Sequence, residues 1–119
     1  MKLAIIGSRG LVINDLENYI PNGVTEIVSG GAKGIDSCAR EYAIANHITL
    51  TEFKPDYSRY KRGAPLKRNL QIIDYADEVL AFWDGKSRGT KYSIDQCRKK
   101  NKKVTVVVIA AVTGKDKNG

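Results

Sequence analysis

Apolar residues gather in five short segments of the chain, each bounded by glycine, proline or charged residues. Most are near-continuous apolar runs, a pattern typical of strands that are covered on both faces of a sheet. The predicted strands cover residues 2–7, 25–29, 48–53, 78–83 and 103–109.

Between the strands, apolar residues recur every three or four positions, which predicts amphipathic helices. The predicted helices cover residues 14–20, 35–47, 64–76 and 90–100. The period is clearest in the second helix, where the apolar positions are Ile35, Cys38, Ala39, Tyr42 and Ala43. Alternating strands and helices predict an α/β fold of three layers, with a parallel five-stranded sheet and helices on both faces.

Finer features are expected at three places in this framework. Asn14 or Asp15 can cap the first helix, and residues 54–63 are expected to form a polar, basic loop. In the third helix, Pro65 lies in the first turn. The apolar stripe expected along that helix is Leu66, Leu70, Ile73 and Ala76.

The length of 119 residues fits one domain, which we place at residues 1–112, followed by a flexible polar tail at 113–119. The longest apolar run, residues 104–112, is too short to cross a membrane as a helix. Cys38 and Cys97 are too few for a disulfide framework and fall in predicted helices. These features predict a cytoplasmic protein with reduced cysteines and no membrane association.

The charge balance favours anionic partners. Twenty Lys and Arg residues against thirteen Asp and Glu residues give a formal net charge of +7. Nucleotides, nucleic acid or an acidic surface would be attracted by such a chain. Part of the excess positive charge has a simpler explanation. The cations of residues 98–103 lie at a predicted helix end, where the helix dipole favours them.

Three unusual loops, at residues 7–10, 29–34 and 84–90, each follow a predicted strand. In open α/β sheets, ligands bind beyond the carboxyl ends of the strands, at the point where the strand order reverses. The recurrence of such loops at strand ends therefore predicts one composite ligand site.

The second loop, Ser29-Gly30-Gly31-Ala32-Lys33-Gly34, leads directly into a helix. Free N–H groups and the helix dipole favour an anion there, and Lys33 can add a positive charge. The spacing is neither that of the dinucleotide fingerprint nor that of the Walker A motif. A tight turn that needs glycine is the competing interpretation. Asp36, in the first helical turn, either complements the helix dipole or accepts a hydrogen bond from a ribose hydroxyl.

The first and third loops offer similar chemistry. Ser8 and Arg9 suit phosphate oxygens, although Arg9 is also compatible with an ordinary surface position. Gly89 and Thr90 open a helix and form a second potential anion site, with Thr90 as the N-cap in the simpler interpretation. Trp83 is a candidate for stacking on a base, and a core position is its alternative.

A basic stretch between the third strand and the third helix adds another candidate surface. Aromatic side chains interleaved with cations bind single-stranded nucleic acid, and they would equally suit a lid over one nucleotide or a solvated loop. Its residues are Lys54, Tyr57, Arg59, Tyr60, Lys61, Arg62, Lys67 and Arg68.

Catalytic and metal-binding constellations are weak in this sequence. His47 is the only histidine and falls at a predicted helix end, where a structural role is expected. No cluster has the spacing of metal ligands, and no Ser-His-Asp set can be assembled around His47. We therefore predict neither a metal nor a cofactor.

In combination, these motifs resemble the SLOG superfamily, which contains the DNA-processing Smf proteins and the Lonely Guy phosphoribohydrolases. The resemblance spans residues 2–109 and is nearest to small stand-alone members. It rests on Gly7-Ser8-Arg9, the run from Ser29 to Asp36, Arg68-Asn69, and the run from Asp84 to Thr90. It implies a Rossmann-like fold that binds nucleotides or their derivatives between these loops, and it implies a homodimer.

The same resemblance bears on catalysis. Lonely Guy enzymes carry a catalytic glutamate three residues after their glycine-threonine pair, and this chain has Ser93 there. The next acid is Asp95, and Arg68 would correspond to an arginine that those enzymes use. Asp36, Arg68 and Asp95 are therefore the only catalytic candidates.

Binding or sensing of a phosphorylated, nucleotide-derived ligand is the function we expect. Hydrolysis of a base–ribose bond and Smf-type binding of single-stranded DNA are the alternatives. The expected ligand-binding residues are Gly7, Ser8, Arg9, Ser29, Gly30, Gly31, Lys33, Gly34, Asp36, Arg68, Asn69, Asp84, Ser87, Gly89 and Thr90.

Overall fold

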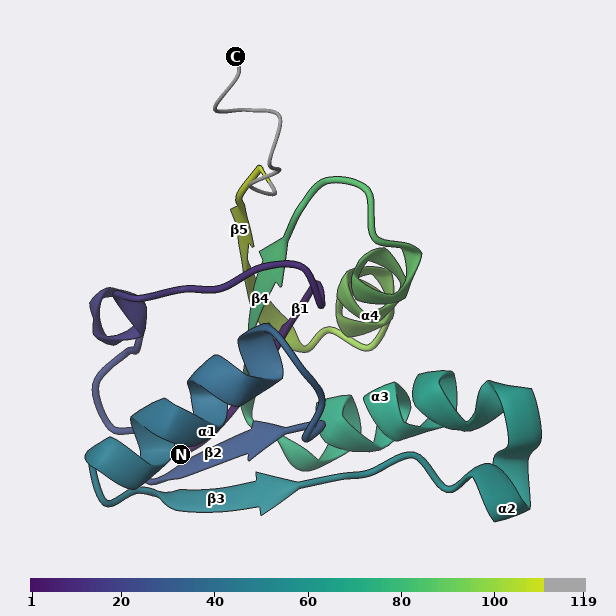
Figure 1. The fold of residues 1–119 in the computed structure, drawn as a ribbon, viewed down its shortest axis with the longest axis horizontal. Coiled ribbons are helices and arrows are strands. Elements are labelled where there is room, and N and C mark those ends of the chain that lie inside the picture. The colour runs from purple at the N-terminus through teal and green to yellow at the C-terminus, as the bar shows by residue number, and fades with distance from the viewer. Residues whose placement is uncertain (111–119) are drawn as a thin grey trace.

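Five parallel strands form a single sheet in the computed structural model, which describes residues 1–110 (Figure 1). The strands are β1 (Lys2–Gly7), β2 (Glu26–Ser29), β3 (Thr49–Glu52), β4 (Glu78–Trp83) and β5 (Lys103–Val108). Their order is β3-β2-β1-β4-β5, and every neighbouring pair is parallel. The predicted fold is thereby confirmed, and the proposed tail at 113–119 lies outside the described residues.

Burial on both faces explains why the strand segments are so apolar. In β1, Leu3 and Ile5 belong to one core cluster, whereas Ala4 and Ile6 belong to the other. Successive side chains of a strand point to opposite faces, so a strand covered on both sides needs apolar residues at every position.

Helices cover the two faces unequally. The helices are α1 (Ile35–Ala45), α2 (Tyr57–Tyr60), α3 (Ala64–Tyr75) and α4 (Arg88–Lys99), and the 3-10 turns are η1 (Leu16–Asn18) and η2 (Lys61–Gly63). One face packs against α1 and η1, and the other packs against α3 and α4 (Figure 1). None of the helices within residues 1–110 is long and apolar enough to cross a membrane.

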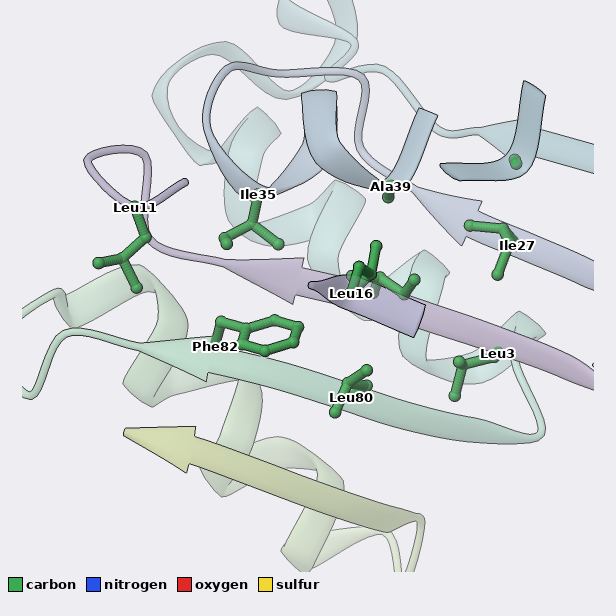
Figure 2. Close-up of a cluster of buried hydrophobic side chains, with 10 residues drawn as sticks. Leu3, Leu11, Leu16, Ile27, Ile35, Ala39, Leu80 and Phe82 are labelled. Atoms are coloured by element: carbon green, nitrogen blue, oxygen red, sulfur yellow. The ribbon is translucent and has the colours of Figure 1, made fainter. Parts of the chain in front are cut away.

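The core on the α1 face joins segments that are far apart in the sequence. Figure 2 shows Leu80 and Phe82 of β4 beneath Ile35 of α1, with Leu16 of η1 in the same cluster. Tyr19 adds an edge-to-face contact with Phe82 at a centroid distance of 5.2 Å. This cluster anchors the β1–β2 connection to the sheet.

The helix predicted at 14–20 is wrong, because only the 3-10 turn η1 forms there. Asp15 makes no capping hydrogen bond with its side chain, and Leu16 is the only buried residue of the turn. Residues 14–20, which Pro21 follows, are too few to form a stable α-helix without extensive packing.

The basic segment 54–63 is more ordered than expected, because it contains α2 and η2. Asp56 caps α2, since its Oδ1 accepts hydrogen bonds from the Arg59 N–H at 3.2 Å and the Ser58 hydroxyl at 2.7 Å. A capping aspartate directly before a short polar helix is the sequence signal that was missed.

Two predicted helix details need correction. In α3, the buried face follows Ala64, Arg68 and Ile72 at intervals of four residues, so Leu66 is left 41% exposed. In α4, the helix begins at Arg88 and its N-cap is Ser87 rather than Thr90.

The connections that leave β1 and β4 turn toward opposite faces of the sheet. The segment after β1 packs on the α1 face, whereas α4 packs on the other face. Because β1 and β4 are neighbours, their diverging loops leave a crevice at the carboxyl edge of the sheet.

Candidate functional site

A cavity of about 390 Å³ lies at this carboxyl edge, and residues of all three predicted loops line it. Its volume is near the lower end of the range for small-molecule sites, roughly 300–1,000 Å³. The expected site residues that line it are Gly7, Ser8, Arg9, Gly30, Lys33, Asp36, Arg68, Asn69, Asp84, Ser87, Gly89 and Thr90.

Four expected residues lie outside the cavity lining. Ser29 is fully buried and its Oγ accepts the Gly31 N–H at 3.4 Å. A Cβ on Gly31 would lie 3.4 Å from Glu52 Cδ, and Glu52 does not line the cavity. Asp95 is half-exposed and forms a salt bridge with Lys91 at 2.8 Å. The fourth is Gly34, which lies against the Arg9 backbone.

Several lining residues were not among the individual residues expected to bind the ligand. They are Ile6, Gly10, Ala32, Pro65, Ile72 and Ser93. Helical spacing could have identified two of them, because Ile72 is four residues after Arg68 and Ser93 is three residues after Thr90. Residues at these intervals share a helix face, so both follow the expected residues into the cavity.

Ser93 occupies the position of the glutamate that the Lonely Guy resemblance implies. It is buried, and its hydroxyl donates to the Gly89 carbonyl at 3.2 Å. The side chain is therefore occupied by its own helix, and no carboxylate faces the cavity from this part of α4.

One end of the cavity is built from hydroxyl groups at the start of α4. The Ser8 and Thr90 hydroxyls are 3.4 Å apart, and the Ser87 hydroxyl donates to Thr90 Oγ1 at 3.2 Å. Ser8 also accepts the Asp84 N–H at 3.3 Å. The first backbone N–H groups of a helix have no acceptor within the helix, so this end offers several donors to an anion.

Asp84 stabilises the loop before α4. Its Oδ1 accepts the backbone N–H groups of Ser87 at 2.7 Å and Lys86 at 2.8 Å. These hydrogen bonds favour the ionised carboxylate and lower the pKa of Asp84. The carboxylate therefore shapes the loop that carries Ser87.

Arg68 forms the other end of the cavity and is only 7% exposed. Its Nη1 donates to the carbonyls of Gly30 at 2.8 Å and Phe53 at 3.3 Å, and its Nε donates to Asn69 Oδ1 at 2.9 Å. Within residues 1–110, Nη2 has no hydrogen-bond acceptor. A buried cation with a free donor at a cavity wall is suited to a polar ligand.

Asp36 lies beside this arginine. Its Oδ2 accepts the Ala32 N–H at 3.0 Å. Burial raises the pKa of Asp36, while the Ala32 hydrogen bond and the charge of Arg68 partly oppose that rise. A carboxyl group that is costly to ionise therefore faces the cavity.

We expect Asp36→Asn to stabilise the protein at pH 7. Because the folded-state pKa of Asp36 is raised, the folded protein loses stability as pH rises from the usual value of 3.8 through the raised one. The variant removes this cost, so its melting temperature should exceed that of the wild type at pH 7. The difference should vanish below pH 3.8, where the carboxyl is protonated in both states. Calorimetry across this pH range would contradict the interpretation if the two proteins differed equally at every pH.

Two glycines of the second loop allow close approaches that a side chain would prevent. A Cβ on Gly30 would lie 2.5 Å from Arg68 Nη1 and 2.9 Å from Asp36 Oδ2. Gly34 has φ 72° and ψ −124°, and a Cβ there would lie 2.8 Å from the carbonyl carbon of Arg9 and still closer to its oxygen. Gly30 thus makes room for the charged pair, and Gly34 brings the first two loops together.

The basic stretch is divided by the structure. Arg68 lies in the cavity, while the other cations are exposed on and around α2 and η2. Tyr60 packs against two of them, with Arg59 Cζ at 5.4 Å and Lys67 Nζ at 5.6 Å from the ring centroid. Tyr57 is 57% exposed. Cations and aromatic rings therefore share one surface beside the cavity.

Trp83, the candidate for base stacking, lies outside the cavity lining. Its indole N–H donates to the Ser87 carbonyl at 2.9 Å, and its ring borders a separate groove between α4 and β5. His47 is exposed after the end of α1 and does not line the cavity either.

Neither cysteine lines the cavity. Cys38 and Cys97 are both free thiols, and burial raises the pKa of Cys97 to about 11. Within residues 1–110, no group of three or more His, Cys, Asp or Glu side chains is arranged to hold a metal ion.

Comparison with known proteins identifies a family whose model matches this chain. A model of the YAcAr family, described as the YspA, cpYpsA-related SLOG family, matches residues 4–60. The matched region runs from β1 into α2 and includes the first two loops of the cavity. No curated protein and no solved structure matches the chain significantly.

Proposed function

Because this chain belongs to the SLOG superfamily, we propose that its cavity binds a phosphorylated, nucleotide-derived ligand as a binding or sensing site. One observation carries most of the weight. Arg68 is 7% exposed and lines the cavity, yet its Nη2 has no acceptor within residues 1–110. Burying such a donor is costly without a partner, and a bound ligand would supply one.

The phosphate is assigned to the end of the cavity at α4. Ser8, Ser87 and Thr90 supply hydroxyls there, and the helix start supplies backbone N–H groups. Arg9 and Lys33 are exposed and line the same cavity, so they can approach the charge from solvent. A phosphate would thus meet hydrogen-bond donors of three kinds.

The sugar is assigned to the end formed by Asp36 and Arg68. A carboxylate oxygen accepts a hydrogen bond from a hydroxyl group, and the free Arg68 Nη2 donates one to a hydroxyl or ring oxygen. Both groups are fixed by bonds within the protein, Asp36 to the Ala32 N–H and Arg68 to the Gly30 carbonyl. Such fixed groups suit a polar ligand because little ordering is needed on binding.

Thr90→Val tests the phosphate assignment. We expect this nearly isosteric change to weaken the binding of AMP and ADP-ribose by at least about tenfold, because a charge-assisted hydrogen bond and its hydroxyl network are lost. Titration calorimetry measures the effect. The matched control is Thr105→Val, on the exposed part of β5 and outside the cavity, which should bind like the wild type. Equal affinity of both variants for both probes would contradict the assignment.

Hydrolysis of a base–ribose bond is the second candidate, and the environment of Asp36 favours it. Such a reaction breaks the bond between the sugar C1′ and the base nitrogen, adds water at C1′ and delivers a proton to the departing base. A carboxyl with a pKa raised by burial can donate that proton. Release of free base from AMP by the wild type, abolished in Asp36→Asn, would support this activity, whereas binding without release would leave a sensor.

Binding of single-stranded DNA is the third candidate, because exposed cations and tyrosines gather on α2 and η2 beside the cavity. Its signature would be an affinity for oligonucleotides that falls steeply with salt. Replacing Arg59 and Lys61 by glutamine should then abolish oligonucleotide binding and leave AMP binding unchanged.

A further inference from the structure

We propose that the cavity recognises the phosphorylated pentose of its ligand and does not read the base or other group attached to that sugar. This inference rests on the proposed function and narrows its ligand class to pentose phosphates and their derivatives. It follows from the chemistry of the cavity wall.

The apolar part of the wall is aliphatic. Of the residues that the structure describes, the apolar ones larger than alanine that line the cavity are Ile6, Pro65 and Ile72, and no aromatic side chain lines it. Proteins that hold a base usually stack it on an aromatic ring or hydrogen-bond its edge. No aromatic ring of this wall is available for such stacking.

The aromatic side chains near the sheet are engaged elsewhere. Phe82 packs with Tyr19 in the core, and Phe53 packs with Tyr75 at a centroid distance of 5.4 Å. Trp83 borders the groove on the far side of α4. None of these rings can stack on a base in the cavity without repacking.

Each side chain of the wall that could read a base edge is held through one of its oxygens. Asn69 Oδ1 accepts from Arg68 Nε, and Asp36 Oδ2 accepts the Ala32 N–H. Asp84 Oδ1 accepts two backbone N–H groups of its own loop. The second oxygen of Asp36 is assigned above to a sugar hydroxyl, and the hydroxyls, cations and helix N–H groups of the wall match phosphate and sugar oxygens. A base would therefore extend toward solvent.

The experiment compares dissociation constants for AMP, GMP, CMP, UMP, ribose 5-phosphate, adenosine and inorganic phosphate by titration calorimetry. We expect the four nucleotides to agree within about threefold and ribose 5-phosphate to bind within about tenfold of them. Adenosine and inorganic phosphate should each bind at least about a hundredfold more weakly, because each lacks one of the two recognised parts.

Two variants test whether an aromatic ring outside the cavity lining stacks on the base. Tyr57→Ala removes the exposed ring on α2, and Trp83→Leu removes the ring behind α4. Neither should change the ratio between the AMP and ribose 5-phosphate constants. If an aromatic ring stacked on the base, its removal would weaken AMP selectively, by at least about fivefold.

The outcomes separate the inference from the proposed function. One base preferred by more than tenfold over the others would overturn the inference and leave the phosphate site intact. Inorganic phosphate binding as well as ribose 5-phosphate would also overturn it, because the sugar would not be read. No binding of any phosphorylated compound would overturn the proposed function, and the inference with it.

Discussion

Alanine in place of Gly34 is expected to lower the free energy of unfolding by about 3 kcal/mol, the sum of a strained backbone and a steric clash. The positive φ of 72° is unfavourable for any residue with a side chain, and here ψ is −124°, far from the small left-handed region that alanine tolerates. The new Cβ would also meet the Arg9 backbone, which cannot move aside as a flexible side chain would. Denaturant unfolding should show the loss, with a melting temperature lower by roughly 10 °C.

Gly10→Ala is the matched control for this prediction. Gly10 also lines the cavity, but a Cβ there would meet nothing within 4 Å, and its φ is not positive. Its unfolding free energy should stay within about 0.5 kcal/mol of the wild type. Equal stability of the two variants would show that the approach between Gly34 and Arg9 does not constrain the fold.

Replacement of Arg68 by methionine is expected to abolish ligand binding and to lower the unfolding free energy by about 2–4 kcal/mol. The change leaves the Gly30 and Phe53 carbonyls without their donor and removes the cation that lowers the pKa of Asp36. Arg68→Lys should recover part of the stability but little of the binding, because lysine keeps the charge and loses the planar fork.

The pH dependence distinguishes this explanation from a simple packing defect. Once the cation is gone, the pKa of Asp36 rises further, so the ionised carboxyl becomes more costly. The loss of stability in Arg68→Met should therefore be larger at pH 7 than below pH 3.8. Lys67→Met, at an exposed neighbouring position, is the control and should change stability little at either pH.

The sequence was sufficient to predict those elements whose structure depends on burial alone. The strand at Glu78–Trp83 is found with the predicted bounds, because its apolar run is covered on both faces. Strand alternation likewise led to the correct sheet, and the three loops do meet at one cavity.

The sequence pattern was insufficient to predict features that depend on contacts between segments far apart in the chain. Residues 14–20 have helical spacing, but Leu16 is the only buried residue of the η1 turn, and no α-helix forms there. Arg68 was expected to bind the ligand. Its hydrogen bonds to the Gly30 and Phe53 carbonyls could not be predicted, because they depend on how α3 lies against the ends of β2 and β3. Gly34 was expected to contact phosphate because glycine loops bind anions, and the sequence pattern gave no sign of its close approach to the Arg9 backbone.

The cavity wall begins at Ile6 and ends at Ser93, so it draws on most of the described chain. A fragment that stops at residue 60 would contain the segment matched by the family model and yet lack both Arg68 and Thr90. The end of the wall at α4 is complete only when β4 lies beside β1, because Ser8 follows β1 and its hydroxyl contacts Asp84 and Thr90 after β4. Ligand binding would consequently report that the central strands have assembled, and two complementary fragments split at residue 60 would gain it only on reassociation.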